Sequence, residues 1–166
     1  MDIEIKILEE LKKVKFTKNY YRANVSGLDQ EKTDRLGRCV GYPCLSYTFG
    51  LVRPRNKSSL QLSRITKKYM DLYNLLLDYI KTNHPDFSFT SITVNKNIVC
   101  QPHTDRNNKS DSIAVAFGDY TEGGELVVGD VEYNIKNNPI IFNGRTIHYS
   151  KPFSGGDRYS LIFYNL

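Results

Sequence analysis

The chain has few cysteines and no long apolar run, and each shortage excludes a class of protein. It contains three cysteines, and an odd number without a CxxC pair argues against a disulfide framework. Cys39 and Cys44 lie close enough in sequence to share a zinc ion, but no second pair of ligands is nearby, so we expect ordinary reduced thiols. No apolar run approaches the roughly 18 residues that span a bilayer. The sequence therefore predicts neither a disulfide scaffold nor a membrane protein.

The N-terminal sequence MDIEIKILEELKKVK also lacks the features of a secretory signal. It is amphipathic and carries acidic residues from the second position onward, whereas a signal peptide needs a cationic start and an apolar centre. We therefore expect a cytoplasmic or nuclear, non-secreted protein. The length of 166 residues suits one hydrophobic core and is short for two, so we predict a single domain over residues 1–166.

The charge of the chain is unevenly distributed. Residues 1–70 hold 15 Lys/Arg and 7 Asp/Glu, whereas residues 71–166 hold 8 and 11, and the chain as a whole has a net charge of +5. A cationic first half favours a polyanionic partner. A solvated, lysine-rich face is the alternative.

Two stretches have the periodicity of an amphipathic helix. Apolar residues recur at three- and four-residue steps over 3–13 and again over 59–82. Either Ser58 or Ser59 is placed to cap the second helix. His84 follows the end of that helix, where we expect a surface position.

The sequence after Pro85 is typical of an all-β region. A strand is already expected over 45–53, ended by Pro54. Short segments rich in β-branched and aromatic residues then follow at close spacing, separated by turns such as KNNP and SGGD: 89–95, 112–118, 125–129, 131–135, 139–142, 146–150 and 157–164. We predict an α+β fold in which an N-terminal helical region, 1–84, braces a β-sandwich or barrel formed by 85–166.

The stretch QPHTDRNN contains the first residues that suggest chemistry. His103 and Asp105 form an i, i+2 pair, and on an extended strand end their side chains point the same way. His148 is the only other histidine of the predicted β region. Two imidazoles and one carboxylate make the facial triad of non-haem Fe(II) oxygenases, which leaves positions for a co-substrate and dioxygen. A chance trio of packed or solvated residues is the alternative.

An arginine on the last predicted strand strengthens this interpretation. Arg158 lies ten residues after His148, and Ser160 shares its face of the strand. The side chains between and beyond them should pack on the opposite face: Tyr159, Leu161 and Phe163. An arginine facing a β core is costly unless an anion meets it, and a dicarboxylate held by the guanidinium and the serine hydroxyl would supply one. The alternative is an edge-strand arginine paired with Asp157 or Glu132.

The order HxD, distal His and RxS resembles the Fe(II)/2-oxoglutarate-dependent dioxygenases. The resemblance implies a double-stranded β-helix (jelly-roll) core, with Fe(II), 2-oxoglutarate and dioxygen as cofactor and co-substrates. Succinate and carbon dioxide would form as a C–H bond is hydroxylated. It also implies roles for five residues of this chain: metal ligation and catalysis by His103, Asp105 and His148, and 2-oxoglutarate binding by Arg158 and Ser160.

A narrower resemblance is to the TET/JBP branch, whose members oxidise the methyl group of 5-methylcytosine or thymine in nucleic acid. Members of that branch carry an asparagine three residues after the metal aspartate, placed to touch a flipped base, which implies this role for Asn108. The turn Gly123–Leu126 and Gly144 also fit the branch. Asn95 and Asn97 are candidates to line the same site, with a role in turns as the alternative. No separate helix-turn-helix or zinc module accompanies these motifs.

The resulting hypothesis is an oxygenase that acts on a base flipped out of nucleic acid, DNA rather than RNA. Cations of the first half are candidates to hold the phosphates: Arg53, Arg55, Lys57, Arg64, Lys67 and Lys68. Two alternatives stay open at this point. One keeps the chemistry but applies it to a peptide side chain or a small metabolite, and the other is a non-catalytic nucleic-acid-binding domain.

Overall fold

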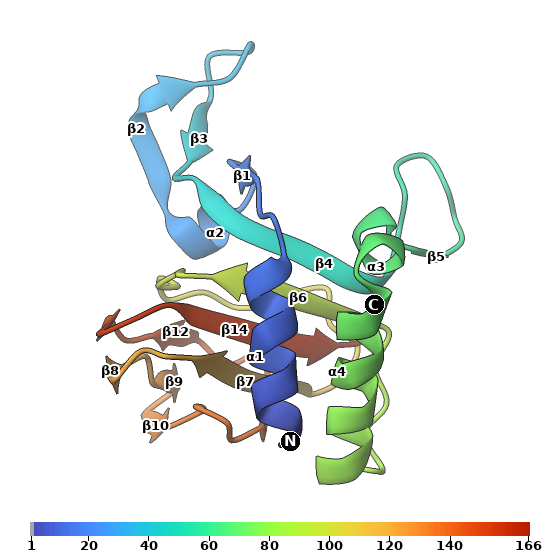
Figure 1. Cartoon of the computed structure of the whole chain (residues 1–166). Coiled ribbons are helices and arrows are strands. Elements are labelled where there is room, and N and C mark those ends of the chain that lie inside the picture. The colour runs from blue at the N-terminus through green and yellow to red at the C-terminus, as the bar shows by residue number, and fades with distance from the viewer. Residues whose placement is uncertain (1) are drawn as a thin grey trace.

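The computed structural model describes residues 2–166, which form three layers (Figure 1). Helices α1 (Ile3–Lys13) and α4 (Met70–Asn83) cover one face of a large sheet. A small sheet lies against the opposite face. Within residues 2–166 no helix combines the length and the apolar character that a bilayer span requires. The observed architecture is therefore α+β with antiparallel sheets, as predicted.

The large sheet has seven strands in the order β1-β4-β6-β14-β7-β11, with β5 paired to β4, and every pairing is antiparallel. Its strands are β1 (Lys18–Asn19), β4 (Cys44–Val52), β5 (Gln61–Leu62), β6 (Ser91–Lys96), β7 (Ser112–Gly118), β11 (Ile140–Phe142) and β14 (Arg158–Tyr164). The last strand of the chain therefore lies at the centre, between β6 and β7.

Three smaller sheets complete the fold. The small sheet of the third layer has the order β10-β9-β12, from β9 (Leu126–Val128), β10 (Val131–Tyr133) and β12 (His148–Ser150). One two-stranded pair joins β8 (Glu122–Gly123) to β13 (Phe153–Ser154). The other joins β2 (Leu28–Thr33) to β3 (Cys39–Gly41) in a hairpin that projects from the body beside the short helix α2 (Ala23–Ser26) (Figure 1).

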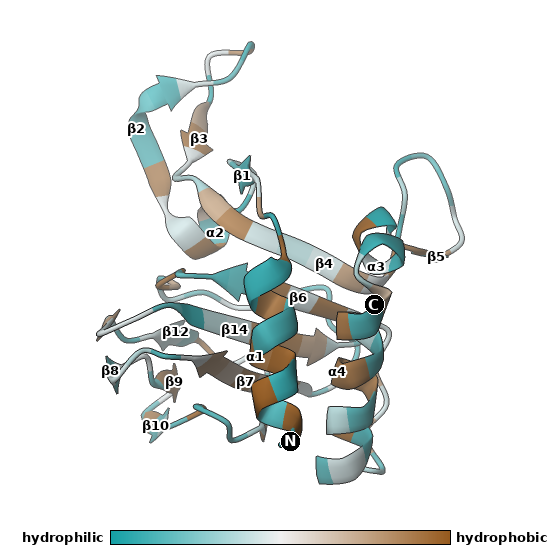
Figure 2. Ribbon diagram, viewed as in Figure 1, coloured by the Kyte–Doolittle hydropathy of each residue, from teal (hydrophilic) through white to brown (hydrophobic). Residues whose placement is uncertain are grey.

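Two apolar cores lie on the two faces of the large sheet. The core under the helices joins Ile7 of α1 and Leu76 of α4 to Phe117 of β7, each fully buried. The second core lies between the large and small sheets, where Ala116 of β7 meets Leu126 of β9. Because an apolar core covers each of its two faces, β7 consists almost entirely of hydrophobic residues (Figure 2).

Strand β14 separates the core under the helices from the space between the large and small sheets. Its core-facing side chains were predicted from the two-residue period of a strand, and all are buried in the core under the helices: Tyr159, Leu161 and Phe163. Arg158 and Ser160 therefore point to the opposite face, between the two sheets. The predicted alternation of this strand is confirmed.

The predicted helix over 59–82 is wrong at its start and interrupted near its middle. Gln61 and Leu62 instead pair with Val52 and Leu51 of β4. The cap is Ser63, whose hydroxyl accepts from the backbone N–H of Thr66 at the start of α3 (Arg64–Lys68). Tyr69 then leaves helical geometry before α4 begins. Edge pairing with β4 thus overrides the helical periodicity.

Replacing Ile7 with alanine should lower the free energy of unfolding by about 2–5 kcal/mol, because its side chain is fully buried against the sheet. Ile5 lies on the same helix but is 52% exposed, so Ile5→Ala should change stability by less than about 0.5 kcal/mol. Urea unfolding followed by circular dichroism measures both variants. Equal losses would contradict the assignment of the buried face of α1.

Candidate metal centre and the adjoining cavity

His103 and His148 are brought together by backbone pairing rather than by proximity in the chain. His103 lies in the long connection from β6 to β7, and His148 is the first residue of β12. The N–H of His103 donates to the carbonyl of His148 at 3.1 Å, and the N–H of His148 donates back at 3.0 Å. This isolated bridge sets the two imidazole rings 4.4 Å apart, centroid to centroid.

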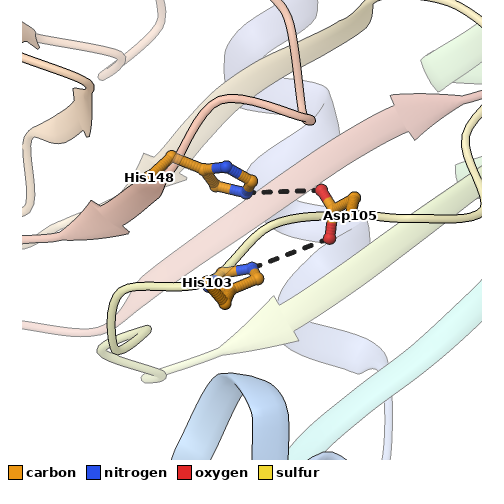
Figure 3. A group of neighbouring side chains, drawn as sticks. All are labelled: His103, Asp105 and His148. Atoms are coloured by element: carbon orange, nitrogen blue, oxygen red, sulfur yellow. Dashed lines mark ion pairs between the residues drawn. The ribbon is translucent and has the colours of Figure 1, made fainter.

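Asp105 completes the cluster through a second backbone contact. Its N–H donates to the carbonyl of Gly144 at 2.8 Å. A Cβ on Gly144 would lie 3.1 Å from Asp105 Oδ2, so this glycine leaves the carboxylate the room it occupies. Asp105 Oδ1 lies 3.7 Å from His103 Nε2, and Oδ2 lies 3.3 Å from His148 Nε2 (Figure 3).

These three side chains have the geometry of one metal site. Ligand atoms from all three lie within 4.8 Å of one another. Adjacent ligands that share one ion at about 2.1 Å are roughly 3 Å apart in an octahedral shell, so small side-chain adjustments suffice for coordination. The structure thus brings together the three residues that the sequence predicted as ligands.

The hydrogen bonds behind the two rings present the correct nitrogen to a metal. His103 Nδ1 lies 2.7 Å from the carbonyl of Gln101, and His148 Nδ1 lies 2.8 Å from the carbonyl of Thr146. A carbonyl only accepts, so in each neutral ring Nδ1 carries the proton and Nε2 keeps its lone pair. Both Nε2 atoms face Asp105 (Figure 3).

Electrostatics distinguish the two histidines. Burial lowers the pKa of His103, which favours the neutral ligand form. Burial acts in the same direction on His148, but its hydrogen bonds to the Asp105 carboxylate and to the Thr146 carbonyl outweigh it and raise the pKa. A proton and a metal ion therefore compete for the same place between His148 and Asp105.

The cluster opens into a cavity of about 980 Å³ between the sheets. The three candidate ligands line it together with Arg158, Ser160 and residues of the segment that carries α2. Figure 3 views this side, with β14 and the large sheet between the cluster and α1. The cavity is large enough for a small co-substrate and part of a larger substrate.

Arg158 is a buried cation without an acidic partner. Its residue is 2% exposed, and no carboxylate of residues 2–166 lies within ion-pair distance of it. The alternative pairing with Asp157 or Glu132 is wrong, because Asp157 accepts from Asn97 and Glu132 pairs with Lys151. The guanidinium therefore keeps N–H donors that an anion could use.

Only part of the Arg158 guanidinium is satisfied by the protein. Nη2 donates to the carbonyl of Gly124 at 2.7 Å, and Nη1 has a longer contact of 3.5 Å to Ile98. Nε is buried without a partner in the described structure. Gly124 has φ +80°, and a Cβ there would lie 2.6 Å from Nε, so the predicted glycine turn is needed for this close approach.

The asparagines predicted to contact substrate separate into two groups. Asn108 and Asn95 line the cavity, and Asn95 Nδ2 donates to Ser160 Oγ at 3.3 Å. Asn97 is not among the lining residues. It has φ +54°, and its Oδ1 accepts from the N–H of Arg158 at 2.7 Å. The turn alternative for Asn97 therefore describes its position.

Arg22 lines the cavity and was missed by sequence reasoning. It precedes α2, and its Nη1 donates to Asn95 Oδ1 at 2.5 Å. No pattern in residues 17–43 signalled this contact, which depends on the fold placing α2 beside β6. By contrast, the cations proposed as phosphate ligands are absent from the cavity lining as the structure describes it: Arg53, Arg55, Lys57, Arg64, Lys67 and Lys68.

The remaining predicted positions have structural roles. Cys39 and Cys44 are free cysteines, and among residues 2–166 the group with the spacing of metal ligands is the cluster around Asp105. His84 ends α4 and is partly buried, with Nε2 at 3.2 Å from the carbonyl of Pro139.

No family model and no curated protein matches this chain. Solved structures do. An oxidoreductase of the 2OG-Fe(II) oxygenase family from Burkholderia pseudomallei is 13% identical with a TM-score of 0.59, covering 96% of this chain and 76% of its own. NgTET1 in complex with 5mC DNA is 14% identical with a TM-score of 0.53, covering 72% of this chain. The fold is that of the 2OG-Fe(II) oxygenases.

The likeness is one of fold, and this fold agrees with the one that the sequence motifs implied. This chain corresponds to 60% of the length of the NgTET1 chain. At 13–14% identity the comparisons establish the oxygenase fold, and the chemistry rests on the residues of the site itself.

Replacing His103 with alanine should abolish stoichiometric binding of Fe(II), because Asp105 and His148 alone do not provide enough ligands to hold the ion. His84→Ala is the matched control, since His84 lies outside the cluster, and it should bind the ion as the wild type does. Anaerobic titration calorimetry, repeated with Mn(II), measures both. Undiminished binding by His103→Ala would contradict the assignment of the site.

Proposed function

We propose that the protein is an Fe(II)- and 2-oxoglutarate-dependent dioxygenase that hydroxylates a C–H bond, with the methyl group of thymine or 5-methylcytosine in nucleic acid as its target. One observation carries the proposal. Two imidazole nitrogens and a carboxylate converge within 4.8 Å in the same cavity as a buried arginine that has no acidic partner among residues 2–166. The facing large and small sheets support a jelly-roll core.

His103, Asp105 and His148 would hold the metal. Two neutral nitrogens and one carboxylate suit Fe(II), and they occupy one face of an octahedron. When bound, Fe(II) with 2-oxoglutarate supplies the activation of dioxygen that oxidation of a C–H bond requires. The Nδ1 hydrogen bonds to backbone carbonyls fix both rings in the ligating orientation.

Arg158 and Ser160 would hold the far carboxylate of 2-oxoglutarate. The guanidinium offers a planar set of donors suited to a carboxylate, and burial strengthens the attraction. The ring centroids of Tyr120 and Phe153 each lie 5.8 Å from Cζ of Arg158, and the two rings limit the movement of the guanidinium. Asn95 donates to Ser160 Oγ, which leaves the hydroxyl proton free to donate to the co-substrate.

Asn108 would contact the substrate base. It lines the cavity, and its Nδ2 donates to Ser112 Oγ at 3.2 Å, which fixes the amide. A Cβ on Gly144 would lie 3.3 Å from Asn108 Nδ2 and 3.1 Å from Asp105 Oδ2, so this glycine keeps the metal ligand and the base contact in one small space. The 5mC DNA in the NgTET1 structure supports a base as the target.

Arg158→Ala should weaken 2-oxoglutarate binding about 10- to 150-fold, the range expected for charge-assisted hydrogen bonds of about 1.5–3 kcal/mol. Arg158→Lys should recover part of the loss, because it restores the charge without the planar pair of donors. Mn(II) binding should persist in both variants. Calorimetry with the Mn(II)-loaded protein measures 2-oxoglutarate affinity, and an affinity equal to that of the wild type in Arg158→Ala would refute this role.

Methyl oxidation is tested by product analysis. The Fe(II)-reconstituted protein is supplied with 2-oxoglutarate and oxygen and with oligonucleotides that contain thymine, 5-methylcytosine or cytosine, and the digested nucleosides are analysed by mass spectrometry. We expect a mass increase of one oxygen on a methylated base, together with succinate. His103→Ala is the inactive control.

The other outcomes identify the alternatives. Succinate formation stimulated by peptides but not by oligonucleotides would move the same chemistry to a peptide substrate. Absence of iron-dependent succinate formation with every substrate would overturn the enzyme proposal and leave a nucleic-acid-binding domain.

A further inference from the structure

The β2–β3 hairpin carries a second hollow, outside the metal cavity. This hairpin groove has a volume of about 710 Å³. Five of its lining residues are aromatic or cationic: Tyr20, Tyr21, Lys32, Arg35 and Arg38. The others are Thr33, Asp34, Leu36 and Val40. Tyr21 is 93% exposed and Leu36 is 76% exposed. The hairpin projects from the body of the molecule, and β2 is mostly hydrophilic (Figures 1 and 2).

The charges in the hairpin groove favour an anionic ligand. Its one acidic residue, Asp34, is occupied within the turn, because it pairs with Arg38 Nε at 2.9 Å and accepts backbone N–H groups of Leu36 and Arg38. Lys32 and Arg35 take part in no ion pair among the described residues. Both side chains therefore remain available to phosphates.

The tyrosines give the groove a surface for flat ligands. Lys32 Nζ lies 5.8 Å from the ring centroid of Tyr20, while the ring of Tyr21 is almost fully solvated. Exposed aromatic rings beside unpaired cations are the combination on which unpaired nucleotides bind, with bases stacked on rings and phosphates held by cations. An acidic peptide would use the cations but would gain little from a stacking surface.

The hairpin groove and the metal cavity are lined by neighbouring residues of the chain. Tyr20 and Tyr21 line the groove, and the next residue, Arg22, lines the cavity. The segment at the root of the hairpin is hydrogen-bonded to the connection that carries His103 and Asp105. Gln101 Nε2 donates to the carbonyl of Ala23 at 2.9 Å, and the backbone N–H of Gln101 donates to the carbonyl of Val25 at 2.9 Å. The segment at the root of the hairpin is therefore anchored beside the metal cavity.

We infer that the hairpin groove binds an unpaired nucleotide next to the one that enters the metal cavity, with Tyr21 stacking on its base and Lys32 and Arg35 binding its phosphates. This inference rests on the proposed function for the identity of the neighbouring base. It assigns phosphate binding to the hairpin rather than to the cations of residues 53–68.

The test compares charge-matched variants. Fluorescence anisotropy with a labelled single-stranded oligonucleotide gives affinity and its salt dependence for Tyr21→Ala, Tyr21→Phe, and the double variant Lys32→Ala/Arg35→Ala. The control is the double variant Arg55→Ala/Lys57→Ala, which removes the same charge from exposed positions outside both hollows. All five sites of substitution are exposed, and thermal melts verify folding.

Tyr21→Ala should bind about 5- to 150-fold more weakly, and Tyr21→Phe should bind as the wild type does. Loss of Lys32 and Arg35 should reduce the slope of log K against log salt by roughly 1.4, at about 0.7 for each phosphate contact of a single strand. The control should leave the slope unchanged. Wild-type affinity in Tyr21→Ala, an equal effect in the control, or equal competition by polyglutamate would each overturn the inference.

Iron-dependent succinate formation, measured with each of the substrates above, separates the two proposals. If the wild type forms succinate but Tyr21→Ala binds normally, the groove inference fails while the enzyme proposal stands. If no succinate forms with any substrate but the groove variants lose affinity as expected, the groove stands and the enzyme proposal fails.

Discussion

The reciprocal backbone hydrogen bonds between His103 and His148 are the constraint on which the site depends. They are one of several such contacts along the connection from β6 to β7, which meets a different element at almost every second residue. The N–H of Asn97 donates to Arg158, that of Gln101 to Val25, and that of Asp105 to Gly144. Ligand positions are thus set by main-chain pairing, which is stiffer than side-chain packing alone. A loop without regular structure can therefore hold two ligand side chains close to the third, His148 of β12.

Arg158 is the second constraint, and it acts in the opposite sense. Burying a guanidinium with incomplete hydrogen bonding lowers stability. The fold accepts this at the start of its central strand, where Asn97 fixes the backbone of Arg158 and Gly124 removes a side chain that would collide with Nε. Because the surrounding structure is arranged around an unneutralised charge, binding of a carboxylate there would stabilise the folded state as well as orient the ligand.

The parts of this structure that sequence could predict are those governed by local period and by motif order. The two-residue period of β14 placed Arg158 and Ser160 on one face correctly. The start of the helix predicted at 59 failed because Gln61 and Leu62 gain more from pairing with β4 than from extending a helix. Arg22 could not be found at all, since its contact with Asn95 joins segments that only the tertiary fold brings together.

Charge shows the same limit from another direction. A count along the sequence correctly indicated that the first half of the chain is cationic, but the densest run, over residues 53–68, contributes nothing to the cavity lining as described. The positive groups that line the cavity are instead Arg22, Arg106 and Arg158. Those of the separate hairpin groove are concealed in any count, because the hairpin holds equal numbers of acids and bases. Asp34 is neutralised within its own turn, so the face that carries Lys32 and Arg35 is more positive than its composition. Position relative to the metal centre, and not net charge, therefore determines which cations can guide a polyanion to the reacting atoms.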